Sequence, residues 1–149
     1  MSARATSLAV GGERRVPAPD PFARDYILLG LRLDQHIPGL VDGYYGPADL
    51  KAQVDVEQTR SPAGLAADAH ALLDRLPDEV ADAQRRDWLK AQLVALSTQA
   101  DALAGNELPY LDHVSRCFAW TPRRRDDAIF EAAAAGLEIL LPGPEPLVA

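Results

Sequence analysis

The sequence predicts an all-α protein, an orthogonal or up-down bundle of five to six helices with a Pro/Gly/Tyr loop after the first helix. Three observations support this fold class. Apolar residues recur at spacings of three and four along most of the chain, and prolines and glycines separate these segments. No stretch alternates apolar and polar residues over a length that predicts a β-strand. The 149 residues, 48% hydrophobic and 25% charged, suit one globular domain with its own core.

The first helix is expected to begin after Asp20, with Pro21 at the first helical position, and to end near His36. One face carries a row of apolar residues, Phe22, Tyr26, Leu29 and Leu33. Other faces carry further apolar residues, Ile27, Leu28 and Leu31. We therefore expect this helix to be central and packed on more than one side.

A loop rich in proline, glycine and tyrosine follows the first helix. Pro38 disfavours the helical conformation at the residue before it, and Gly39 can supply a positive φ. The apolar and aromatic residues of the loop predict that it folds back onto the protein; they are Leu40, Val41, Tyr44 and Tyr45. Replacing either tyrosine with alanine is then expected to cost a few kcal/mol of stability.

Five more helices are expected along the chain. Ser61 and Pro62 begin the third helix of the protein, Pro77 ends it, and Asp78 opens the longest one. The last helix has an apolar stripe, Ile129, Ala133, Leu137 and Leu140. The expected ranges are about 47–54, 61–76, 78–104, 109–118 and 126–141.

The chain is expected to comprise a disordered leader at 1–20, a single helical domain at 21–141 and an extended tail at 142–149. The leader lacks the apolar core of about 7 to 15 residues that a signal peptide needs, and no run approaches the roughly 18 apolar residues of a membrane span. Together with the single cysteine, this predicts a cytoplasmic protein without a membrane partner. A net charge of −7 argues against a nucleic-acid partner.

The candidate ligand-binding site lies at the end of the first helix and in the loop. Asp34, His36 and Asp42 could converge on a pocket walled by Tyr44 and Tyr45. The alternative for Asp42 is a local turn, in which its carboxylate accepts hydrogen bonds from neighbouring backbone N–H groups.

The sequence predicts no catalytic residue, metal site or cofactor. His113 and Cys117 lie four residues apart on one face of a predicted helix, but structural zinc normally takes four ligands. The alternative is a half-buried histidine beside an inert thiol. The glycines at 39, 43 and 46 match no phosphate-binding motif. This chain alone is therefore not expected to be an enzyme.

Residues 33–47, with the run V-D-G-Y-Y-G-P at positions 41–47, resemble the N-terminal part of a bacterial family of largely helical, zinc-metallopeptidase-like proteins. A weaker similarity continues through 88–93 and 104–108 to 140–143. Members of that family carry an H-E-x-x-H zinc helix in their C-terminal part. This chain lacks the motif, because Glu follows none of its three histidines. The resemblance implies a non-catalytic N-terminal module, or a truncated product, of a longer protein.

Two functions from different classes remain open. The chain could be a helical module that covers or shapes a site on a missing C-terminal domain. It could instead be a self-sufficient small protein that binds a partner or forms a homodimer. The module should expose an apolar face along the first helix and the Tyr44–Tyr45 loop. A self-sufficient protein should cover that face itself or bury it in a symmetric dimer.

Overall fold

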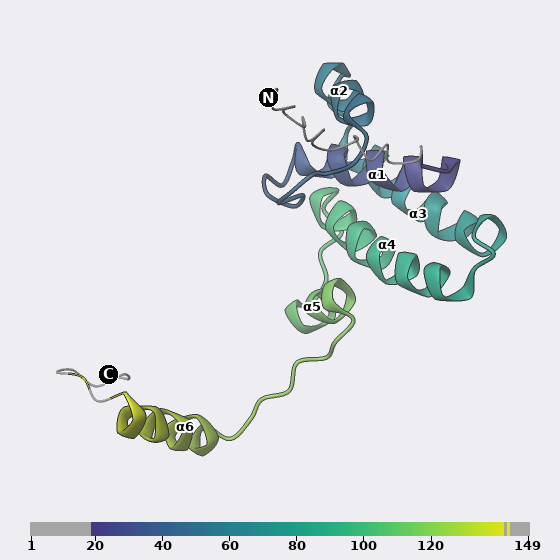
Figure 1. Ribbon diagram of the computed structural model, residues 1–149. Coiled ribbons are helices and arrows are strands. Elements are labelled where there is room, and N and C mark those ends of the chain that lie inside the picture. The colour runs from purple at the N-terminus through teal and green to yellow at the C-terminus, as the bar shows by residue number, and fades with distance from the viewer. Residues whose placement is uncertain (1–18, 142, 144–149) are drawn as a thin grey trace, which may run out of the picture.

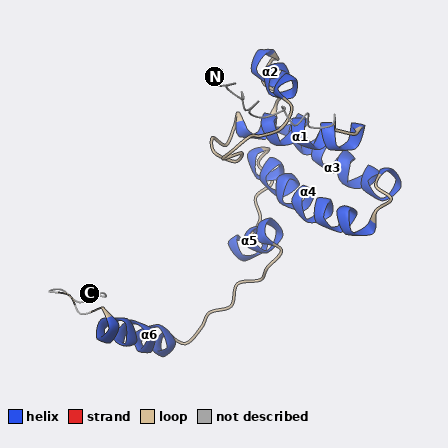
Figure 2. Ribbon diagram, viewed as in Figure 1, coloured by secondary structure: helices blue, strands red, loops and turns tan. Residues whose placement is uncertain are grey.

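The computed structural model describes residues 19–141 and residue 143, and over this part of the chain it is an all-α bundle without β-strands (Figures 1 and 2). The predicted fold class is therefore confirmed. The leader and tail predictions fall almost entirely outside the described residues. No helix described is long and apolar enough to cross a membrane. The six helices are α1 (Pro21–Asp34), α2 (Ala48–Val56), α3 (Pro62–Glu79), α4 (Ala83–Leu103), α5 (Tyr110–Phe118) and α6 (Asp127–Leu140).

Four of the helices begin at a residue whose side-chain oxygen accepts a hydrogen bond from an N–H of the first turn. This bond satisfies one of the N–H groups that have no partner within the helix. Pro21 and Pro62 then occupy the first helical turn, where a missing N–H costs nothing. The capping pairs are Asp20 with Ala23 at 2.8 Å, Ser61 with Gly64 at 3.2 Å, Asp82 with Arg85 at 2.7 Å, and Asp126 with Ala128 at 3.1 Å.

The boundary between α3 and α4 differs from the predicted one. Pro77 does not end α3, which continues through it to Glu79, and Asp82 instead of Asp78 caps α4. The proline lies in the last turn of α3, where its missing N–H removes only one hydrogen bond. The next residue after the helix, Val80, is buried and donates its N–H to the carbonyl of Leu76 at 3.2 Å. Helix α3 therefore ends beyond the proline, at a buried residue.

Helix α1 is packed on two sides, as its sequence predicts. Leu29 and Leu33 belong to a large core cluster with α3 and α4, in which Leu33 and Leu93 are fully buried. Leu28 and Leu31 belong to a second cluster with Leu50 and Val54 of α2. Figure 1 shows the result, with α2 on one side of α1 and the pair α3 and α4 on the other.

The last two helices extend away from this core. Helix α5 packs on α4, whereas α6 contacts no other helix in the described part of the chain (Figure 1). Arg116 donates to the hydroxyl of Thr98 at 2.9 Å, which links α5 to α4. Ala119 then adopts a left-handed conformation with φ of 50°, and residues 120–126 run without helix to α6. No residue of α5 or α6 is buried.

The core and α6 should respond differently to loss of a large aliphatic side chain. Replacing Leu93 with alanine opens a cavity in the core and is expected to lower the free energy of unfolding by about 2 to 5 kcal/mol. Ile139 is 81% exposed on α6, so Ile139→Ala should change the free energy of unfolding by less than about 0.5 kcal/mol. Urea denaturation measures both. A large loss for Ile139→Ala would show that α6 packs on the core.

Candidate functional site

Asp34, the first residue of the predicted ligand site, holds the loop in place. Its Oδ1 accepts hydrogen bonds from the N–H groups of Gly39 at 3.1 Å and Val41 at 3.0 Å. Gly39 has φ of 90°, a conformation that favours glycine, and this lets the chain reverse after α1. Leu40, Val41 and Tyr44 then pack against the two core clusters. The loop folds back onto the protein as predicted, apart from Tyr45.

The other predicted site residues have separate environments. The Nε2 of His36 lies 2.8 Å from the carbonyl oxygen of Arg60, in the connector before α3. Tyr44 donates its hydroxyl to the carbonyl of Pro47 at 2.9 Å, and its partial burial raises the pKa of the phenol. Asp42 is exposed.

Tyr45 is 95% exposed, so the expectation that both tyrosines pack is wrong for Tyr45. Residues 43–45 have no helical or turn structure. Two adjacent side chains outside a helix need not face the same side of the chain, and only Tyr44 faces the core. It packs against the cluster between α1 and α2.

An apolar groove of about 310 Å³ lies between α1, the loop and α4. Tyr44 is the only member of the predicted ligand site among the residues that line this groove. Asp34, His36 and Asp42 are not part of it, so a ligand role for the predicted set stays a prediction. The other walls are mainly apolar and include Tyr26, Ile27, Leu31, Leu40, Val41 and Ala95.

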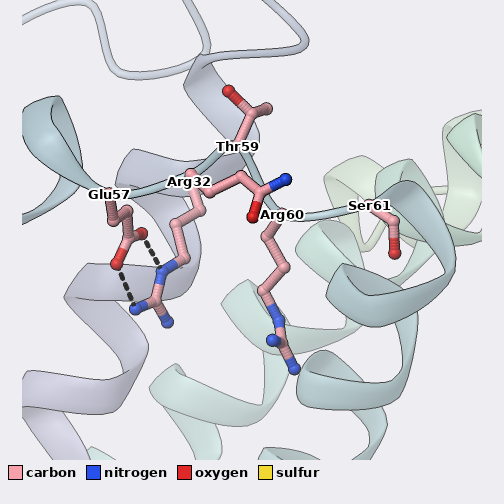
Figure 3. A pocket seen from close by; sticks show the side chains of 6 residues that line it. Arg32, Glu57, Thr59, Arg60 and Ser61 are labelled. Atoms are coloured by element: carbon pink, nitrogen blue, oxygen red, sulfur yellow. Dashed lines mark hydrogen bonds and ion pairs between the residues drawn. The ribbon is translucent and has the colours of Figure 1, made fainter.

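A polar hollow of about 380 Å³ lies where the connector between α2 and α3 passes α1 (Figure 3). Arg32 donates from Nε and Nη2 to the two carboxylate oxygens of Glu57, at 2.5 and 2.9 Å. Arg60 donates to Asp68 at 2.7 Å. Figure 3 shows Thr59 pointing away from the Arg32–Glu57 pair. Both arginines already have a carboxylate partner, so the hollow offers no uncompensated positive charge to an anion.

These pairs affect the ionisation of their members. Hydrogen bonding to Arg32 holds the pKa of Glu57 below its ordinary value of 4.5, and the same contact raises the pKa of Arg32. The sequence does not reveal the pair, because its members are separated by 25 residues. It joins α1 to the segment that follows α2.

The described residues contain no group of three or more histidine, cysteine, aspartate or glutamate side chains placed to hold a metal ion. The Sγ of Cys117 lies 3.6 Å from the Nε2 of Gln99, which donates to it. Partial burial raises the pKa of the Cys117 thiol, which favours the neutral, unreactive form.

Exposed apolar side chains gather instead on the last two helices. On α6 they form one face, called here the α6 face: Ile129, Phe130, Ala133, Leu137 and Leu140. On α5 they form the α5 face: Tyr110, Leu111 and Phe118. Phe118 is 74% exposed and Leu140 is 76% exposed.

Of the two functions left open, the module is expected to expose an apolar face along the first helix and the tyrosine loop, and the self-sufficient protein is expected to cover that face. Helix α1 is covered on two sides, and an apolar groove remains between α1, the loop and α4. The stripe on the last helix is visible in the sequence. Sequence alone cannot show that no other helix covers it, because that depends on tertiary contacts.

Comparison of the chain with protein-family models, curated proteins and solved structures finds no match in any of the three. The resemblance to zinc-metallopeptidase-like proteins therefore stays a prediction.

The two tyrosines of the loop provide a matched pair of variants. Tyr44→Ala removes a packed ring and a hydrogen bond and should lower the free energy of unfolding by about 1 to 3 kcal/mol. Tyr45→Ala removes a ring that is 95% exposed and should change the free energy of unfolding by less than about 0.5 kcal/mol. Equal losses in urea denaturation would contradict the inward placement of Tyr44 alone.

The Arg32–Glu57 pair predicts a pH-dependent contribution to stability. Because the pKa of Glu57 is lower in the folded protein than its ordinary value of 4.5, the contribution is complete above about pH 4.5. It is lost as the pH falls through the lowered pKa. Glu57→Gln should therefore cost about 1 kcal/mol of unfolding free energy at pH 7 and progressively less in acid. A difference that is constant from pH 7 to pH 3 would contradict this account.

Proposed function

We propose that this chain is a non-catalytic helical module that acts by docking its α5 and α6 faces onto another protein surface. The single observation that supports this most is the α6 face, on an amphipathic helix that contacts no other described helix. Contiguous exposed apolar surface of this kind usually marks an interaction site. Covering a large apolar side chain contributes about 1.5 to 3 kcal/mol, so several of them can drive stable binding.

The folded core does not need these faces. Its main cluster is built from α1, α3 and α4 together with Leu40, Val80 and Ala104, while its second cluster joins α1, the tyrosine loop and α2. Two polar side chains of the predicted ligand site make structural hydrogen-bonding contacts with the backbone. Asp34 holds the loop, and His36 contacts the connector before α3. The exposed surface on α5 and α6 is thus the part of the described chain best suited to binding.

The resemblance to zinc-metallopeptidase-like proteins suggests one setting for such a module. There it would cover or shape a zinc site carried by another part of the protein. The second candidate is a self-sufficient protein that dimerises, and the charge distribution at the C-terminal helices favours it. Helix α6 carries three carboxylates and no basic residue, whereas the segment 110–126 carries four arginines and two aspartates.

The docking function can be tested by placing a charge on the α6 face. We expect the parent chain either to associate or, while monomeric, to bind an apolar fluorescent dye. Leu137→Asp should lose that property without a change in unfolding free energy, because Leu137 lies outside the core. Ile139→Asp is the matched control, since residue 139 lies on the opposite side of α6. A parent chain that neither associates nor binds the dye would contradict the proposal.

A further inference from the structure

We infer that the docking partner is a second copy of this chain, and that the two copies exchange α6. In this arrangement the α6 face of each copy packs against the α5 face of the other. The inference rests on the proposed docking function and goes beyond it by naming the partner. Each copy already presents both surfaces that such an interface requires.

The connector keeps α6 away from the α5 face of its own chain. Ala119 starts it with a left-handed conformation, and residues 120–126 have no helix or turn, with Pro122 in the middle. Figure 1 shows the connector extended, with α6 at its far end. Two copies of a protein can exchange an element when an extended hinge holds that element away from the rest of its own chain. The α5 face is thereby left open to the α6 of another molecule.

Charge also matches a second copy. Helix α6 has only acidic charged residues, Asp127, Glu131 and Glu138. On α5 itself Asp112 and Arg116 balance, and the basic part of the receiving segment is the connector after α5, where Arg123, Arg124 and Arg125 precede the single carboxylate of Asp126. Only Arg124 of the connector arginines pairs with a described carboxylate of its own chain, Asp127, at 3.2 Å. Opposite charges at the rim of an apolar contact favour the correct pairing of surfaces.

Exchange produces a closed assembly. The contact of α6 from the first copy with α5 of the second is repeated by α6 of the second with α5 of the first. The two contacts are related by a twofold axis, so the assembly ends at two chains and does not grow into a filament. The predicted species is therefore a dimer with twice the mass of the 16.1 kDa chain.

Light scattering of the full chain over a range of concentrations tests the inference. The parent should reach the dimer mass, and Leu137→Asp should raise the dissociation constant by about 100-fold, since it places a charge in an apolar contact. Phe118→Asp on the α5 face should weaken dimerisation similarly. Ile139→Asp, on the other side of α6, should leave it unchanged. Circular dichroism and urea denaturation confirm that each variant folds.

A mixture of the two defective variants distinguishes exchange from other dimers. A heterodimer of Phe118→Asp and Leu137→Asp chains contains one intact contact, between the normal α6 of the first chain and the normal α5 of the second. Mixing should therefore restore dimers that neither variant forms alone at the same concentration. A mixture that stays monomeric, or a dimer disrupted by Ile139→Asp alone, would overturn the exchange of α6.

The failure of this inference differs from failure of the docking function. Suppose that the parent chain stays monomeric but binds the apolar dye, and that Leu137→Asp abolishes dye binding. This result would overturn the inference that the partner is a second copy. The α6 face would then remain a docking surface for another protein, such as a zinc-bearing domain. A monomer that binds no dye overturns both proposals.

Discussion

Burial of α1 on two sides is the constraint on which the rest of the described structure depends. Leucines at 28, 29, 31 and 33 face different directions because successive helical residues are rotated by about 100°. They therefore contact α2 on one side and the pair α3 and α4 on the other. Asp34 ends α1 and accepts two hydrogen bonds from the loop, which directs the chain toward α2. The Arg32–Glu57 pair then links α1 to the end of α2.

Sequence reasoning succeeded where local chemistry decides the structure. Caps such as Asp20 and Ser61, followed by proline, mark helix starts that the structure confirms. It failed where tertiary packing decides. Pro77 is compatible with the last turn of a helix, and α3 ends beyond it, next to the buried Val80. Tyr45 shows the same limit, because two adjacent tyrosines look equivalent in sequence although only Tyr44 reaches the core.

The candidate site shows more clearly where sequence reasoning fails. Asp34, His36 and Asp42 are close in sequence, which suggests convergence, but hydrogen bonds direct the first two to different parts of the backbone. The apolar stripe of α6 is visible in the sequence as the stripe of an ordinary core helix. Only the arrangement of helices shows that this stripe is uncovered. The apolar stripe of α6 was therefore predicted from the sequence, whereas its exposure and the α5 face were found only in the structure.

Native-state hydrogen exchange at several protein concentrations tests most directly whether α6 is a docking element outside the core. Amides of α1, α3 and α4 should exchange slowly even in the monomer, because their helices form the core. Amides of α6 should exchange rapidly when the chain is dilute and become protected as its concentration rises and copies associate. Protection of α6 equal to that of the core at every concentration would show that it packs within its own chain and would contradict the account.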